Sequence, residues 1–147
     1  MPTILSHTID IQAPADRVWA VLTDTAAYPT WNPFMTRLEG DLVVGARLAV
    51  TVVPPGGKPN NFSPTVTEVE PGRRLAWLGR LLATWIFAGA HSFEVRPLGP
   101  GATRFTQSER FSGLLVPLLR STLRSTEAGF AVMNTALAER AETGVRH

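Results

Sequence analysis

The sequence has no cysteine, only a small excess of charge and no long apolar run, and each absence excludes a class of protein. Without cysteine, disulfides and thiolate metal sites are excluded. The net charge is +2, and the arginines are scattered along the chain rather than clustered as nucleic-acid binding favours. No apolar run approaches the ~20 residues that span a bilayer. We therefore expect neither a nucleic-acid partner nor a transmembrane segment.

The start of the chain, Met1-Pro2-Thr3-Ile4, lacks the basic segment and apolar run of a secretory signal, so we expect a cytoplasmic protein. The 147 residues, 44% of them hydrophobic, fit one domain. No linker, internal repeat or low-complexity tract interrupts them. The sequence therefore predicts a single domain over residues 1–147.

Hydrophobic periodicity predicts a strand, then two short helices, then a run of strands. β-branched residues predict the first strand at 3–11, and Pro14 suits the first turn of a helix over 16–23. Prolines and aromatics at 28–33 favour a second helical turn. Short Gly- and Pro-rich turns separate six further strands, which implies an antiparallel meander. These strands are predicted at 34–39, 46–53, 62–70, 73–81, 87–97 and 102–111.

From about residue 114 to 142 the period becomes helical, with one stripe of inward residues. A sheet of seven strands must bend around this helix to bury its apolar face. The fold class is therefore α+β, with a curved seven-stranded antiparallel sheet around a long C-terminal helix. The stripe comprises Leu115, Leu118, Leu119, Thr122, Thr126, Phe130, Met133 and Leu137.

Alternation along the last two strands indicates which side chains face the helix. Odd-numbered positions of the next-to-last strand are mainly apolar, and Phe105 and Phe111 indicate the same inward parity for the last one. This parity also turns His91, Gln107 and Glu109 inward. Each is costly in a dry core unless hydrogen-bonded, which favours a wet or ligand-filled space.

Register sharpens this expectation. If the turn at 99–101 centres the last hairpin, His91 lies opposite Gln107 or Glu109 and diagonal to the other. If the apolar turn around Thr84 centres the preceding hairpin, Trp77 lies opposite His91. The predicted row therefore runs across three strands, from Trp77 through His91 to Glu109 or Gln107.

A series of short motifs runs in order through nearly the whole chain. They are Ile11-Gln12-Ala13-Pro14 with Val18-Trp19, Trp31-Asn32-Pro33, Val66-Thr67-Glu68-Val69-Glu70-Pro71 with Leu75-Ala76-Trp77, Gly89-Ala90-His91-Ser92-Phe93, Thr103-Arg104-Phe105-Thr106-Gln107-Ser108-Glu109, and Gly113. This order resembles the START-like, helix-grip (SRPBCC) superfamily, in its polyketide cyclase/dehydrase-like branch. The resemblance implies an apolar cavity under the last helix. It implies no particular reaction, because the superfamily includes carriers, sensors and enzymes.

We predict that this cavity binds a hydrophobic small molecule that is lipid-, polyketide- or aromatic-like. A core filled by its own side chains, as in an interaction domain, is an alternative, because aromatic residues and methionine at this spacing also suit simple packing. No cofactor or metal site is expected, since no metal-ligand spacing or phosphate loop occurs. Expected lining residues are Trp31, Leu48, Val50, Val66, Trp77, His91, Phe93, Phe105, Gln107, Glu109, Phe111, Leu118, Phe130 and Met133.

His91 and Glu109 allow two functions. As a general acid/base pair they would suit a cyclase- or dehydratase-like enzyme. As groups of the pocket wall they would orient a ligand or satisfy one another, which suits a carrier or sensor. We favour the second function over catalysis.

The stretch 81–87 crosses a turn with almost no polar residue. An apolar hairpin tip indicates a partner surface, an entrance flap or membrane contact, unless the start of the last helix covers it. We expect an entrance or a homodimer contact through Leu82, Trp85 and Ile86.

Overall fold

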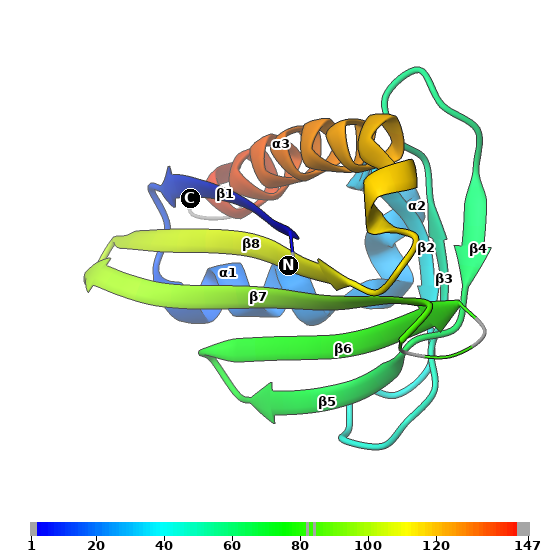
Figure 1. Cartoon of the computed structure of the whole chain (residues 1–147). Helices are drawn as coiled ribbons and strands as arrows, with labels where there is room; N and C mark the ends of the chain where they lie inside the picture. Colours follow the sequence, from blue (N-terminus) through cyan, green and yellow to red (C-terminus); the bar gives the residue numbers. More distant parts are fainter. Residues whose placement is uncertain (1–2, 82, 84, 144–147) are drawn as a thin grey trace.

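A curved antiparallel sheet bends around one long helix in the computed structural model of the chain (Figure 1). The structure describes residues 3–81, 83 and 85–143. In chain order the elements are β1 (Thr3–Ile11), α1 (Ala15–Thr23), a 3-10 turn (Thr25–Ala27), α2 (Tyr28–Trp31), β2 (Met35–Glu39), β3 (Ala49–Val52), β4 (Asn60–Phe62), β5 (Thr65–Glu70), β6 (Arg74–Leu81), β7 (Phe87–Gly99), β8 (Ala102–Ser112), a second 3-10 turn (Val116–Leu118) and α3 (Arg120–Thr143).

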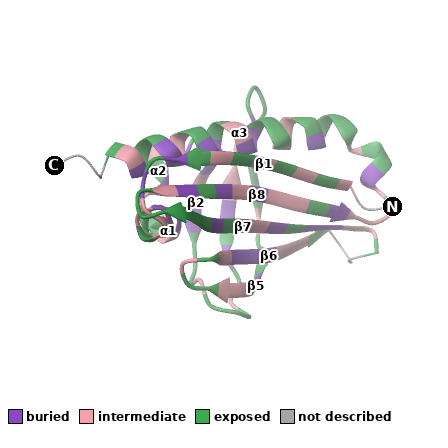
Figure 2. Cartoon of the chain, turned by 90° about the vertical axis from the view of Figure 1, so that its left-hand side faces the viewer, coloured by how far each residue is buried: buried purple, intermediate pink, exposed green. Residues whose placement is uncertain are grey.

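The strands form a five-stranded sheet, ordered β1-β8-β7-β6-β5, and a three-stranded sheet, ordered β2-β3-β4. Backbone hydrogen bonds join the two, among them Leu48 N–H to Pro64 O and Val66 N–H to Ala46 O, both 2.9 Å. α3 runs beside β1, at the edge of the larger sheet (Figure 2). The predicted α+β arrangement is therefore confirmed.

One predicted strand is divided in the structure. Residues 62–70 form the end of β4 and the whole of β5, so the described part of the chain has eight strands rather than seven. Pro64 lies between them, and proline has no N–H with which to continue a ladder. The chain crosses from the smaller sheet to the larger one at this point.

The final helix begins later than its sequence pattern predicts. Pro117 lies in a 3-10 turn, and α3 begins only at Arg120. Phe130 and Met133 are buried as expected, whereas Leu118 is 78% exposed, so the expectation that Leu118 faces the interior is wrong. The 3-10 turn has fewer residues per turn than an α-helix, so the stripe does not continue through it. No helix among the described residues is long and apolar enough to cross a membrane.

The two short helices close one end of the core. α1 buries Val18 and Leu22, and α2 buries Tyr28, whose hydroxyl donates a hydrogen bond to the Leu22 carbonyl at 2.5 Å. Burial removes water from the phenol and raises the pKa of Tyr28 well above its ordinary value, with a smaller contribution from the Asp24 carboxylate. The phenol therefore remains a neutral donor in the folded chain.

We expect alkaline pH to ionise Tyr28 only as the protein unfolds. Its pKa is raised in the folded state, so its stabilising contribution is complete below about pH 10 and is lost as pH rises above that value. Tyr28 is the single tyrosine, so tyrosinate absorbance reports on it alone. Absorbance and circular dichroism should change together as pH rises. Ionisation near pH ~10 with the fold intact would contradict this expectation.

Candidate functional site

The inner face of the sheet brings Trp77, His91 and Glu109 into one row. Trp77 on β6 pairs with His91 on β7, and His91 pairs with Glu109 on β8. Gln107 lies diagonal to His91, opposite Phe93. The predicted row is confirmed, and Glu109 takes the opposite position of the two that the sequence allows.

The His91 imidazole is held on both sides. Its Nδ1 lies 3.2 Å from Glu109 Oε1, and its Nε2 lies 2.8 Å from Gln107 Oε1. His91 is 3% exposed, while the Glu109 side chain is 16% exposed. A Cβ at Gly89 would lie 2.5 Å from Glu109 Oε2, so glycine at this position leaves the space that the carboxylate occupies.

Two residues outside the predicted site extend these contacts. Gln107 Nε2 donates to Asn134 Oδ1 at 2.8 Å, and Asn134 Nδ2 donates to the His7 carbonyl at 3.0 Å. The same Nδ2 lies 3.1 Å from His7 Nδ1. His7 shares the inward parity of β1, a signal that the sequence analysis did not use. Asn134 interrupts the apolar stripe of α3, and nothing local distinguishes it from a surface asparagine.

The hydrogen-bond partners of Asn134 and Gln107 indicate which nitrogen of His91 carries a hydrogen. The carbonyl of His7 can only accept, so Asn134 presents its amide N–H there and its Oδ1 to Gln107. Gln107 then turns Oε1 toward His91 Nε2, which must carry a hydrogen. A neutral imidazole has one N–H, so Nδ1 would face Glu109 with a lone pair. The contact is therefore attractive only when a further proton lies between Nδ1 and the carboxylate.

Aromatic rings surround His91 on its other faces. The ring centroids of Phe93, Phe130 and Trp77 lie 4.7, 5.1 and 5.4 Å from that of the imidazole. The indole N–H of Trp77 is buried and has no hydrogen-bond partner within the described part of the chain. The row thus combines an apolar wall with polar groups, and the expected open cavity beside His91 stays a prediction.

The remaining candidates separate into interior and surface positions. Trp31 is half-buried and packs edge-on against Tyr28, with centroids 5.3 Å apart. Leu118 is exposed, as described above. Leu82 lies outside the described residues, whereas Trp85 is 66% exposed and Ile86 is half-buried. The buried candidates are Leu48, Val50, Val66, Phe93, Phe105, Phe111, Phe130 and Met133.

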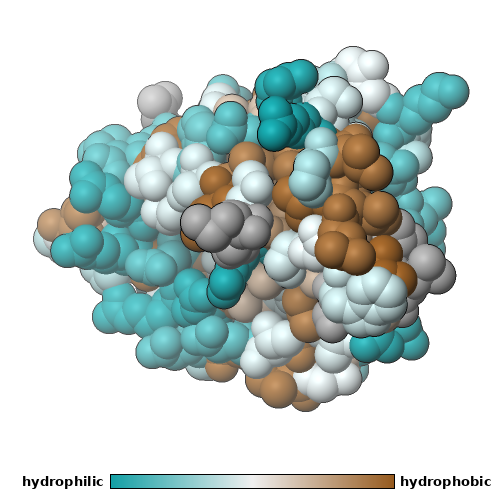
Figure 3. Space-filling view, viewed as in Figure 1, coloured by the Kyte–Doolittle hydropathy of each residue, from teal (hydrophilic) through white to brown (hydrophobic). Residues whose placement is uncertain are grey.

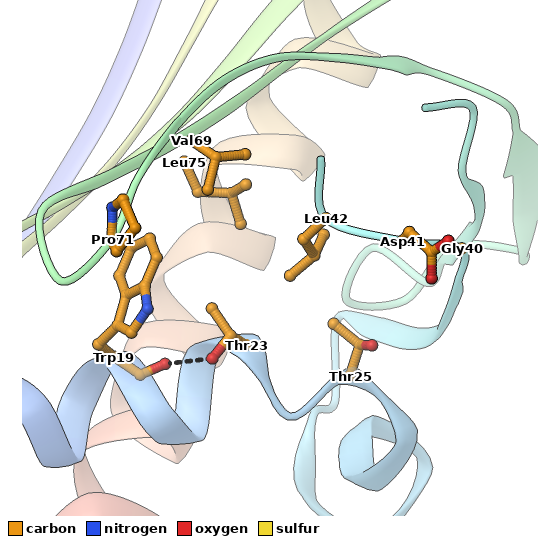
Figure 4. A pocket seen from close by; sticks show the side chains of 9 residues that line it. All are labelled: Trp19, Thr23, Thr25, Gly40, Asp41, Leu42, Val69, Pro71 and Leu75. Carbon is orange, nitrogen blue, oxygen red and sulfur yellow. Dashed lines mark hydrogen bonds between the residues drawn. The ribbon is translucent and has the colours of Figure 1, made fainter. Parts of the chain in front are cut away.

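A pocket of about 360 Å³ opens between α1, the loop after β2 and the turn between β5 and β6 (Figure 4). Its wall includes Leu75, which pairs with Phe93 and lies two residues from Trp77 on β6. The pocket therefore reaches the same concave face as the row. A second pocket, of about 270 Å³, lies over β3 and β4. The described residues hold no cluster of three or more histidine, aspartate or glutamate side chains that could bind a metal.

Comparison with known protein families identifies the family. The model of the family described as polyketide cyclase / dehydrase and lipid transport matches residues 2–142. The chain belongs to this polyketide cyclase / dehydrase and lipid transport family. Proteins of this family bind hydrophobic small molecules, so a hydrophobic ligand-binding or cyclase-type function follows at this level. No curated protein sequence matches the chain.

Solved structures that are similar to this chain have the same helix-grip fold. The Zhui aromatase/cyclase from Streptomyces sp. R1128 has a TM-score of 0.83 and 20% identity over 99% of this chain and 97% of its own. Norcoclaurine synthase from Thalictrum flavum has a TM-score of 0.77 and 18% identity, covering 99% and 98%. A START superfamily protein from Mycobacterium smegmatis has a TM-score of 0.71 and 20% identity, covering 97% and 99%. At these identities the likeness concerns the fold alone.

Proposed function

We propose that this chain binds a hydrophobic small molecule against the concave face of its sheet, as a carrier or sensor. The observation that carries the proposal is the indole N–H of Trp77, which finds no hydrogen-bond partner among residues 3–81, 83 and 85–143, on a side chain that is 1% exposed. A buried donor without a partner costs about 1–3 kcal/mol, which a ligand bearing an acceptor would recover. The neighbouring rings of Phe93 and His91 favour an aromatic or polyketide-like ligand.

The hydrogen bonds of His91 support binding rather than catalysis. Both ring nitrogens already contact protein groups, Glu109 and Gln107, so neither is free for a substrate proton. A fully engaged imidazole instead supplies a rigid wall with a defined polarity. The His91 ring and the Trp77 indole would together select a ligand by shape and by one acceptor atom.

Access to the row would come through the pocket beside Leu75. Apolar groups of Trp19, Val69 and Leu75 line that pocket (Figure 4), and Leu75 has the same inward parity on β6 as Trp77. The rings of Trp77 and Phe93 pack against each other and against His91, so a ligand must displace at least one ring to reach the Trp77 N–H. Binding of this kind should reduce the mobility of the aromatic side chains.

A matched pair of ligands tests the role of Trp77. Acetylnaphthalene carries a carbonyl acceptor, whereas ethylnaphthalene has nearly the same shape and none. We expect the wild type to bind acetylnaphthalene about tenfold more tightly, a difference of one well-placed hydrogen bond. Trp77→Phe should abolish the difference while keeping the aromatic wall. Titration calorimetry measures both affinities, and Trp85→Phe, at the exposed hairpin tip, is the control.

Two results would contradict different parts of this proposal. Equal affinity of the wild type for the two naphthalenes would contradict the role of the Trp77 N–H. No affinity for either, combined with no compound released when protein from its native host is denatured and extracted, would contradict binding itself. In that case the core would be filled by its own side chains, as in an interaction domain.

A cyclase- or dehydratase-like reaction is the second candidate, because Glu109 and His91 are positioned to share a proton. The 3.2 Å contact with His91 Nδ1 is made by Oε1, so the Glu109 carboxyl group could pass that proton through its other oxygen to a substrate carbonyl or hydroxyl. Loss of water from an extracted polyketide-like compound, seen by mass spectrometry, would show turnover. Glu109→Gln should stop it and leave binding intact. Unchanged compound in the wild-type incubation would exclude this reaction for that compound.

A further inference from the structure

Three large apolar side chains project from one end of the molecule. Trp85, Leu114 and Leu118 are 66%, 71% and 78% exposed, and we call this set the apolar tip. The Leu114 N–H donates to the Trp85 carbonyl at 3.1 Å, so the hairpin between β6 and β7 and the turn before α3 form one surface. Figure 3 shows hydrophobic residues gathered over this turn. The start of the last helix therefore lies beside the hairpin without covering Trp85.

The segments that carry the apolar tip are positively charged. Arg80, Arg110, Arg120 and Arg124 are all exposed. No aspartate or glutamate occurs at 71–93 or 110–126, although the whole chain has a net charge of only +2. The charge of the protein is thus unevenly distributed along the chain, and arginines precede and follow the exposed apolar residues in the sequence.

The N-terminal end of α3 adds to this positive charge. Helices favour acidic residues in their first turn, where the helix dipole is positive. α3 has none there, and it begins with Arg120 followed one turn later by Arg124. This arrangement costs helix stability in isolation and favours an anionic partner near the apolar tip.

Close backbone contacts join the two segments that carry the apolar tip. Gly113 has a φ of +110°, and a Cβ there would lie 2.5 Å from the Ile86 carbonyl oxygen. A second backbone hydrogen bond between the hairpin and the turn runs from Leu115 N–H to Ile86 O at 3.1 Å. These contacts hold the hairpin and the turn side by side in the free protein, which lowers the entropy cost of bringing them together on a partner.

We propose that the apolar tip inserts into the surface of an anionic lipid bilayer. Projecting leucines gain from transfer into the acyl region, tryptophan favours the membrane interface, and arginines are attracted to anionic headgroups. A symmetric homodimer through the same surface would place each arginine group against its own copy, which is repulsive. This surface therefore suits a membrane better than a second copy of the chain.

Vesicle co-sedimentation of the full chain tests the proposal. We expect binding to vesicles of phosphatidylcholine with phosphatidylglycerol, and much weaker binding to phosphatidylcholine alone. Arg120→Gln with Arg124→Gln should lower the affinity about fivefold for each arginine, and Leu114→Ser with Leu118→Ser by about tenfold or more. The control for the leucine pair is Val43→Ser with Val44→Ser, two exposed apolar residues far in sequence from the apolar tip. The control for the arginine pair is Arg96→Gln, at another exposed arginine.

Each other outcome overturns the proposal. Binding that the arginine pair reduces but the leucine pair does not would indicate charge attraction without insertion. A concentration-dependent dimer in sedimentation velocity, abolished by Trp85→Asp and accompanied by no vesicle binding, would assign the apolar tip to self-association. Absence of both vesicle binding and dimerisation would exclude a bilayer as the partner of the apolar tip.

Discussion

Replacing Asn134 by leucine is expected to destabilise the fold by about 3 kcal/mol, although leucine is more apolar and the better helix former. Asn134 is fully buried, and its amide joins Gln107 Nε2 to the His7 carbonyl. Leucine would leave both of those groups without a partner, at about 1–3 kcal/mol each. This cost exceeds any gain from apolar burial, because the environment was already arranged for an amide.

Urea unfolding followed by circular dichroism measures this effect, with Thr135→Leu as the control at the adjacent exposed position. The double substitution Asn134→Leu with Gln107→Leu should cost less than the sum of the single ones, since it removes both partners together. Additive losses would mean that the amides act independently. A variant as stable as the wild type would show that the contacts from Glu109 to His7 do not hold the interior together.

Replacing Gly129 by alanine is the second substitution with a large expected effect, and here two principles predict opposite signs. Alanine is favoured over glycine in a helix by about 1 kcal/mol. Gly129, however, is buried against the Phe34 ring, and a Cβ there would overlap the ring carbons. Phe34 also packs edge-on against Phe130, so it has little freedom to move. We expect overpacking to dominate and the variant to lose about 2 kcal/mol.

The control is Ala128→Gly, which reports helix propensity alone because Ala128 is exposed on the neighbouring position of α3. In the background Phe34→Leu, the smaller side chain should make room, so that Gly129→Ala becomes neutral or stabilising. Thermal or urea unfolding gives each free energy. A stabilised Gly129→Ala in the wild-type background would mean that Phe34 moves at little cost, contrary to this account.

Local patterns were sufficient for the strands and for the row at the site. Side chains alternate along a strand with a period of two and tight turns hold the register, so Trp77 could be aligned with His91, and His91 with Glu109 or Gln107, from the sequence; the structure selects Glu109. The same reasoning failed where backbone chemistry interrupts a pattern. Pro64 divides one expected strand, and the 3-10 turn containing Pro117 leaves Leu118 at the surface.

The α+β class and the inward parity of the last strands follow from local periodicity, because the period of a strand or a helix is set by neighbours a few positions apart. Asn134 and His7 are 127 positions apart, and the folded chain alone brings them together to extend the contacts of His91 through Gln107. The tertiary structure also decided how the rings fill the space around the imidazole and where the pocket opens. Packing of that kind depends on the crossing of α3 over the sheet, which no local period encodes.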